Sequence, residues 1–254
     1  MKKMPILNMK TVSFLMLSAM LAACGSGGSK GALTTTSTNT RPVPTVPTPT
    51  NVTYDGHAVV VSSNLGKQSM AINNLSGKAL NQITLNGKVM NLVPSGNTTG
   101  GWLKVDTHTV KKDVYMGLQH TVFGRYSEDG GVDNTVVVNG QVTPLDKIPN
   151  ANTVTYNGNA LYMYGNSGKV WLGTAKFDVN FATKQLEGQI QEPGGNFTDV
   201  DLKATISGNT FKGDHNGTTT QGHFYGPNAE EMGGVYYKGT KDNPEYLGAF
   251  GAKK

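Results

Sequence analysis

The residue with the most specific chemistry is Cys24, the only cysteine in this chain of 254 residues. It follows Leu21-Ala22-Ala23, and the four residues together are typical of a bacterial lipobox. At such a motif the thiol forms a thioether to diacylglycerol, and the new amino terminus is acylated, commonly with palmitate. Two buried acyl chains already anchor a protein stably, since each methylene contributes about 0.8 kcal/mol. We therefore predict that Cys24 is a lipidation site; the alternative is an ordinary secretory signal with an incidental cysteine.

The residues on either side of this cysteine predict an export signal and a tether. Residues 11–20 form an apolar stretch that is too short to span a bilayer, which takes about 20 residues. We expect residues 1–23 to be a signal peptide and residues 24–52, rich in Gly, Ser, Thr and Pro, to be a tether. Gly25, rather than Asp, follows the cysteine, which favours the outer membrane over the inner one. The positive start of the signal consists of Lys2, Lys3 and Lys10.

Histidine is the other residue type that could bind a metal or a cofactor. The chain has five: His57, His108, His120, His215 and His223. None stands at metal-ligand spacing from another, and a single cysteine excludes both a thiolate-rich zinc site and an intramolecular disulfide framework. We predict that His215, next to an Asn-Gly pair, lies in a turn and that His223 is structural. The histidines by themselves therefore predict no metal centre.

Catalytic signatures are missing from the sequence. There is no G-x-S-x-G, no H-E-x-x-H and no Walker A motif. The adjacent carboxylates Glu230 and Glu231 are interpreted as the solvated start of a short helical turn capped by Asn228, and not as a catalytic pair. We expect a binding protein rather than an enzyme.

The charge balance argues against a nucleic-acid partner. The formal charge is +5, from 22 basic and 17 acidic residues. Three of the lysines lie in the predicted signal peptide, and the remaining chain has 19 basic against 17 acidic residues. Proteins that bind nucleic acid through phosphate neutralisation carry clustered basic residues, and no such cluster is present. We predict no nucleic-acid partner.

The remaining chain has the pattern of β-strands. Apolar residues alternate with polar ones, as in Phe177, Val179 and Phe181, and such alternation is typical of strands with one buried face. Glycine is abundant, with 33 residues, and favours turns. No amphipathic helical stretch of ten residues is apparent. Asn-Gly pairs favour type I′ hairpins, and they occur at 86–87, 139–140, 157–158 and 216–217.

These strands predict an all-β fold in two parts. Roughly eight strands fit between residue 132 and the end of the chain, and closing them into an antiparallel barrel removes exposed strand edges. Residues 246–251 are apolar enough to be the closing strand. Residues 53–131 alternate less clearly, and we expect them to form a separate small β subdomain. The predicted domains are thus a β subdomain at 53–131 and an eight-stranded barrel at 132–254.

The order of motifs in the second part resembles that of a known family. Residues 222–234 read GHFYGPNAEEMGG, and the chain closes with GAFGAKK. Together with the lipobox, these segments resemble the C-terminal barrel of the transferrin-binding protein B superfamily. Factor H-binding, heparin-binding and hemophilin-type surface lipoproteins of Gram-negative bacteria share that barrel. In this resemblance, residues 53–131 correspond by position to the "handle" that precedes the barrel.

The resemblance implies a function at the cell surface. It implies an outer-membrane lipoprotein that a dedicated translocator, the surface lipoprotein assembly modulator, exposes on the outside of the cell. It also implies a ligand from a host, either haem or a haem or iron protein taken up as a nutrient. The alternative is an adhesin, colonisation or immune-evasion protein that binds a host protein such as a complement regulator.

The hemophilin branch of the resemblance implies histidine ligands to haem in the handle. His57, His108 and His120 lie in that region and are the candidate ligands. His120 has apolar neighbours in sequence, and Arg125, Lys111 and Lys112 are close to it in sequence as candidates to hold the propionates. The alternative for each is an ordinary strand histidine. Haem is thus the only cofactor we expect, and its iron is the only metal.

The aromatic residues of the barrel could instead contact a protein, because Tyr and Trp are common interface anchors. They are equally common in barrel walls, which is the simpler interpretation for most of them. The loops between hairpins are the natural place for a partner surface. The aromatic residues concerned are Tyr162, Tyr164, Trp171, Tyr236, Tyr237 and Tyr246.

Overall fold

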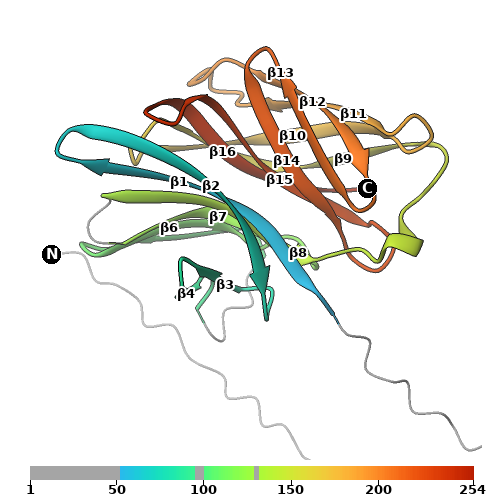
Figure 1. The fold of residues 1–254 in the computed structure, drawn as a ribbon, viewed down its shortest axis with the longest axis horizontal. Helices are drawn as coiled ribbons and strands as arrows, with labels where there is room; N and C mark the ends of the chain where they lie inside the picture. The colour runs from blue at the N-terminus through green and yellow to red at the C-terminus, as the bar shows by residue number, and fades with distance from the viewer. Residues whose placement is uncertain (1–51, 95–99, 129–131) are drawn as a thin grey trace, which may run out of the picture. The chain divides into compact units, whose positions relative to one another are not determined.

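A computed structural model describes residues 52–94, 100–128 and 132–254, and nearly all regular structure in this part is strand (Figure 1). The first eight strands are β1 (Tyr54–Asn64), β2 (Lys67–Gly77), β3 (Gln82–Leu85), β4 (Lys88–Asn91), β5 (Trp102–Asp106), β6 (Val110–Tyr115), β7 (Thr121–Glu128) and β8 (Asp133–Gln141). A 3-10 turn, η2 (Leu145–Lys147), follows. The last eight strands are β9 (Thr153–Tyr164), β10 (Val170–Asn180), β11 (Gln185–Gln191), β12 (Val200–Ser207), β13 (Thr210–His215), β14 (Thr218–Tyr225), β15 (Glu231–Thr240) and β16 (Asn243–Lys253).

Strands β9 to β16 form a closed antiparallel barrel, as predicted. The ladder closes because β9 pairs with β10 on one side and with β16 on the other. The alternation of apolar residues is the cause of this arrangement: Phe177, Val179 and Phe181 are completely buried inside the barrel, whereas the residues between them face outward. The predicted closing strand, residues 246–251, lies within β16.

The handle is a six-stranded sheet in the order β2-β1-β8-β7-β6-β5, covered on one face by the β3–β4 hairpin. Because both faces of its central strands are covered, these strands are nearly continuous buried runs rather than alternating ones. On β1, Ala58 packs towards the hairpin, whereas Val59 and Val61 pack towards the barrel. This explains the weak alternation in the handle sequence.

Strand β8 belongs to the handle and not to the barrel. It lies between β1 and β7 and pairs with both of them. The handle therefore extends to Gln141, beyond the predicted boundary at residue 131, and the barrel strands begin at Thr153. The sequence of β8 did not show this, since a buried apolar strand has the same composition in either sheet.

Two of the four Asn-Gly pairs are turns. Asn86-Gly87 and Asn216-Gly217 connect strands and have the positive φ angles that such hairpins require. The other two pairs lie inside strands. Asn139 uses its side chain to donate hydrogen bonds to the carbonyl oxygens of Ala79 and Leu80, at 3.0 and 2.8 Å. Gly158 allows β9 to approach β16, because an added Cβ would lie 2.0 Å from the carbonyl oxygen of Gly251.

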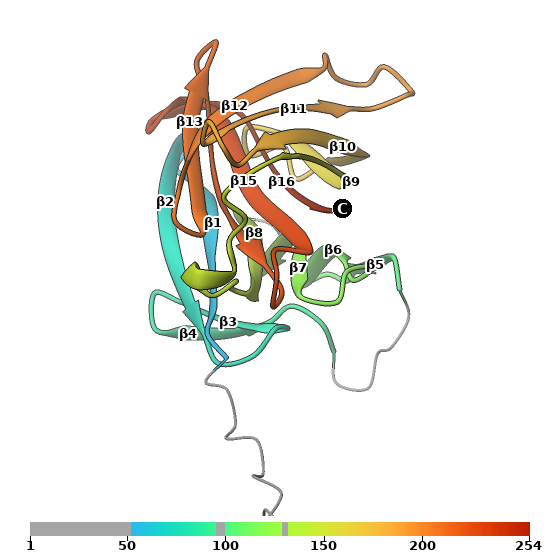
Figure 2. The same cartoon turned by 90° about the vertical axis from the view of Figure 1, so that its right-hand side faces the viewer.

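The handle packs on the outer wall of the barrel (Figure 2). Val59, Phe123 and Val138 of the handle share one buried cluster with Leu161 and Val235, which point outward from the barrel. We call this contact the seam. A large apolar contact of this kind fixes the two sheets relative to each other.

The predicted helical turn at Glu230 is absent, and Glu231 is buried in the seam. The chain reverses in a tight turn instead, with φ of +86° at Gly226 and +55° at Ala229. Glu231 is 4% exposed and accepts hydrogen bonds from the backbone N–H groups of Gln119 and His120, at 2.7 and 3.0 Å. The prediction of two solvated carboxylates is therefore wrong for Glu231, which joins the barrel to a handle loop.

Candidate functional site

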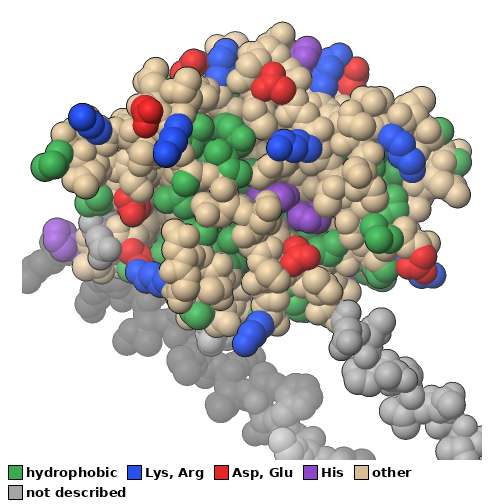
Figure 3. Space-filling model, viewed as in Figure 1, with side chains coloured by type: hydrophobic (Ala, Val, Ile, Leu, Met, Phe, Trp, Pro, Cys, Tyr) green, Lys and Arg blue, Asp and Glu red, His purple; other side chains and the backbone are tan. Residues whose placement is uncertain are grey.

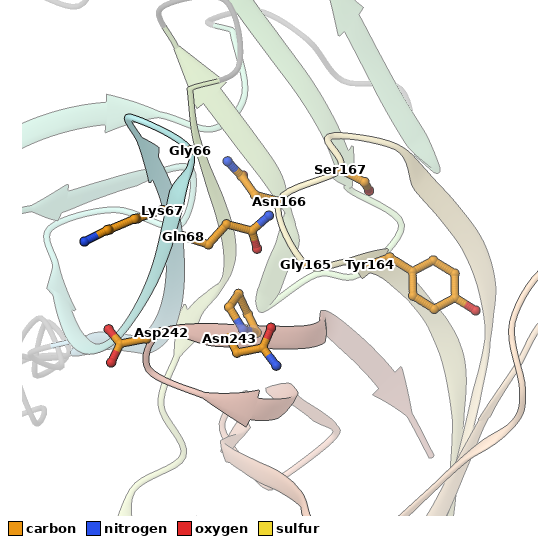
Figure 4. Close-up of a pocket in the computed structure, with 10 residues that line it drawn as sticks. Gly66, Lys67, Gln68, Tyr164, Gly165, Asn166, Ser167, Asp242 and Asn243 are labelled. Carbon is orange, nitrogen blue, oxygen red and sulfur yellow. The ribbon is translucent and has the colours of Figure 1, made fainter.

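Three turns meet at one end of the described structure and enclose a cleft of about 990 Å³ (Figure 4). The β1–β2 turn contributes residues 66–68, the β9–β10 turn residues 164–167, and the β15–β16 turn residues 242–244. One wall therefore comes from the handle and the other two from the barrel. We call this feature the tip cleft.

The turns around the tip cleft are held by backbone and side-chain hydrogen bonds. The Met70 N–H donates to the carbonyl oxygen of Lys241 at 2.6 Å, which joins β2 to the β15–β16 turn. The side chain of Asn166 donates to the carbonyl oxygen of Val132 at 3.0 Å and accepts from Asn134 at 2.6 Å. A surface fixed in this way loses less conformational entropy when a partner binds.

The lining of the tip cleft is polar. Side chains of Gln68, Asn166 and Asn243 offer amide donors and acceptors, and Lys67 and Asp242 offer one charge of each sign (Figure 4). The lining contains no histidine. Such a surface can form hydrogen bonds with a polar partner but holds no nucleophile activated by a histidine base. On the face drawn in Figure 3, positive and negative side chains are likewise interspersed.

An aromatic cluster lies next to the tip cleft at the mouth of the barrel. Tyr164 lines the cleft and contacts the rings of Tyr162 and Trp171, with centroids 4.8 and 5.3 Å apart. Tyr162 stacks on Phe197 at 4.2 Å and contacts Tyr246 at 5.1 Å. The structure thus brings together five of the six predicted aromatic residues, since Tyr236 also contacts Tyr246 at 6.4 Å. Phe197 was missed, because it lies in a loop without alternation.

Only part of this cluster is open to a partner. Tyr162 is 3% exposed and Tyr236 is completely buried, and burial raises the pKa of both phenols. These two residues belong to the barrel core, which agrees with the interpretation of the aromatic residues as parts of the barrel wall. Tyr237 is half-buried against the seam. Tyr164, in contrast, is 43% exposed. We call the tip cleft, Tyr164 and Trp171 together the tip surface.

The predicted histidine ligands do not come together. His57 lies on β1 and is 9% exposed, and its ring stacks on that of His223 of β14, with centroids 4.8 Å apart. Its Nδ1 lies 3.1 Å from the Asn74 side-chain oxygen and 3.3 Å from the Gln221 side-chain nitrogen. Burial, with a smaller effect of His223, lowers the pKa of His57 to about 4. Burial likewise lowers the pKa of His223 to about 4.

The other two candidates lie elsewhere in the handle. His108 is exposed in the connection between β5 and β6. His120 is half-buried just before β7, and its Nδ1 lies 3.1 Å from the side-chain oxygen of Gln141. It borders a pocket of about 270 Å³ that also includes Glu230, Lys253 and Lys254.

These surroundings do not fit haem. Haem iron takes a neutral imidazole that faces an apolar pocket large enough for the macrocycle. His57 faces polar side chains and a second imidazole, and the pocket at His120 is small and charged. His108 has no enclosed surroundings. Among residues 52–94, 100–128 and 132–254, no three His, Cys, Asp or Glu side chains are grouped to hold a metal ion.

Cys24, the signal peptide and almost all of the predicted tether lie outside the described residues. Within the described part, no helix has the length and apolar character that crossing a bilayer requires.

Comparison with known proteins identifies the barrel. Residues 148–254 match the family model described as the C-lobe and N-lobe β-barrels of Tf-binding protein B. This range includes all eight barrel strands and excludes the handle.

Three similar proteins cover different shares of this chain. The chain is 27% identical over 226 residues to an uncharacterised protein of Haemophilus influenzae, which covers 78% of this chain and 75% of that protein. It is 29% identical to transferrin-binding protein B of Neisseria meningitidis serogroup B over 43% of this chain and 20% of that one. It is 33% identical to the neisserial heparin binding antigen over 41% of this chain and 23% of that one.

A solved structure has the same fold. The isotype 1 transferrin-binding protein B of serogroup B Neisseria meningitidis superposes with a TM-score of 0.59 at 22% identity, covering 79% of this chain and 43% of that one. The chain spans less than half the length of the curated transferrin-binding protein B relatives and of this solved structure. The matching family model, the relatives and the shared fold show that the barrel of this chain is similar to the β-barrels of transferrin-binding protein B.

Proposed function

We propose that this chain is a lipoprotein of the outer membrane, exposed on the cell surface, that binds a host protein through the tip surface. Cys24 would carry the lipid, and a translocator for surface lipoproteins would expose the folded part. The relatives named for binding transferrin or heparin support a ligand of host origin. The proposal depends most on Tyr164, which leaves 43% of its surface exposed beside a preformed polar cleft.

The chemistry of the tip surface suits a protein partner. Exposed aromatic residues that neighbour a polar rim are typical of interface anchors. Trp171 also lies below the Lys169 ammonium group, at 4.8 Å from the ring centroid, so its outer face is already partly occupied. Tyr164 is therefore the best candidate for the central contact.

Binding of purified serum transferrin to intact cells that display the full chain tests this proposal. A complement regulator serves as a second probe for the alternative of immune evasion. We expect one of the two to bind and the Tyr164→Ala variant to bind about tenfold more weakly. The Leu145→Ala variant is the control, because Leu145 is 68% exposed on η2, before the opposite end of β9. Equal binding by the Tyr164 variant would place the contact elsewhere.

Haem capture stays a separate prediction. A visible spectrum of the detergent-solubilised full chain, recorded with and without haemin, tests it directly. A Soret shift that His120→Ala or His57→Ala abolishes would support haem binding. An unchanged spectrum would leave the host protein as the ligand.

A further inference from the structure

The β1–β2 hairpin has a turn residue that its two counterparts in the same chain do not have. Leu65-Gly66 has φ angles of 49° and 78°, which nearly repeat those of Asn86-Gly87 (50° and 77°) and Asn216-Gly217 (53° and 77°). All three are two-residue turns between paired strands. Leu65 therefore stands where both other turns have asparagine.

Leucine is unfavourable at this position for two separate reasons. The left-handed backbone conformation brings a Cβ close to the following carbonyl oxygen, and only Gly, Asn and Asp adopt it readily. Leu65 is also 98% exposed, so its side chain gains nothing from burial in the fold. Neither local conformation nor packing within the described structure explains the leucine. A residue that costs stability without a structural return is typical of a functional site.

The turn that contains Leu65 lies at the edge of the tip cleft. The next three residues, Gly66, Lys67 and Gln68, form the handle wall of the tip cleft. Leu65 thus projects at the edge of the surface that Tyr164 borders from the barrel side.

The backbone beside the turn favours a polypeptide as partner. β2 is an edge strand of the handle sheet. The Met70 N–H points away from β1, since it donates to the carbonyl oxygen of Lys241. Backbone groups of alternate residues in an antiparallel strand point the same way, so the N–H and C=O of Gln68 also point away from β1, at the cleft wall. An extended segment of another protein can pair with such an edge.

We propose that Leu65 is the apolar anchor of the tip surface: its side chain enters an apolar pocket on a host protein while an extended segment of that protein pairs with the Gln68 backbone in the tip cleft. This inference rests on the proposed function, because it requires a protein ligand at the tip surface. It names a second contact, on the handle, that acts together with Tyr164 on the barrel.

The Leu65→Asn variant separates binding from stability. Asparagine restores the turn residue that the chain uses elsewhere, so we expect the thermal midpoint of the solubilised full chain to rise by about 2–4 °C. The affinity of this variant is measured for the probe that the unmodified chain binds, either transferrin or the complement regulator. We expect that affinity to fall about tenfold. The matched control, Asn216→Leu, creates the same unfavourable turn at β13–β14. It should lower the midpoint and leave binding unchanged.

The outcomes distinguish the two proposals. If the unmodified chain binds neither probe, the proposed function is rejected, and the proposal that Leu65 is an anchor is rejected with it. If it binds and Leu65→Asn binds equally well, only the anchor is overturned. A lower midpoint in Leu65→Asn would show that the leucine supports the fold, which also overturns the anchor.

Discussion

The imidazole rings of His57 and His223 stack with their centroids 4.8 Å apart, one from the handle and one from the barrel. Both rings are 9% exposed, and His223 Nδ1 has no hydrogen-bond partner among the described residues. The seam therefore contains two imidazoles that can take up a proton, although a charge there is poorly solvated.

This pair predicts that acid destabilises the fold. Burial lowers the pKa of each ring to about 4 in the folded state, against 6.5 when unfolded. The unfolded chain therefore binds more protons between these values, and stability falls as the pH drops from about 6.5 to about 4. The loss is on the order of 2–3 kcal/mol per histidine. Urea unfolding at a series of pH values measures it.

A substitution identifies the source of that pH dependence. The His57→Gln variant removes one titrating group, so its stability should fall less steeply with acid than that of the unmodified chain. His108→Gln is the control, because His108 is exposed in a connection between strands. An unchanged slope in His57→Gln would assign the acid sensitivity to other groups.

The buried carboxylate Glu231 predicts a second effect on the seam. It accepts two backbone hydrogen bonds from the loop before β7, so Glu231→Gln should destabilise the fold by about 1.5–3 kcal/mol, the usual value for a hydrogen bond to a charged group. Urea unfolding measures the loss. Glu187→Gln is the matched control: its carboxylate pairs with Lys203 on the surface, and its loss should cost less than about 1 kcal/mol. Equal effects would contradict the role of Glu231.

Gly158 predicts how sensitive barrel closure is to added volume. A methyl group there would lie 2.0 Å from the carbonyl oxygen of Gly251 on the neighbouring strand. We expect Gly158→Ala to destabilise the barrel by about 1–3 kcal/mol or more, because the backbones must separate. Gly100→Ala is the control, since no atom lies within 4 Å of its added Cβ. Thermal midpoints compare the two, and a stable Gly158→Ala variant would show that the ladder is more adaptable than described.

Cys24 predicts the location of the whole chain. Cys24→Ala should abolish incorporation of radiolabelled palmitate and shift the protein out of the membrane fraction, because no acyl chain can then be attached. Fractionation and labelling of cells measure both. If the Cys24→Ala protein stays in the membrane fraction and still carries the palmitate label, lipidation at this residue is contradicted. External protease on intact cells tests surface exposure separately.

The sequence predicted the barrel well because its signals are local. Phe177 and Val179 alternate with polar residues along β10, Phe181 continues this pattern just beyond the strand, and the closing strand was visible from its apolar residues. The boundary of the handle was missed, because β8 pairs with β1, a strand far away in the chain. Alternation shows that a strand has a buried face but not which sheet it joins.

The candidate site was harder to predict for the same reason. The aromatic residues could be named from the sequence, but the cleft exists only where three turns from distant parts of the chain meet. Asn139 and Glu231 show the opposite error. Their residue types suggested a turn and a solvated helix start, and tertiary contacts override both.

The pairing of β9 with β16 has a consequence for how the barrel is assembled. One edge of β9 is covered only when β16, the last strand, pairs with it. Any partial barrel made from the earlier strands therefore has an open edge. During its synthesis the chain therefore exposes a strand edge that can pair with other copies until residues 243–253 are in place.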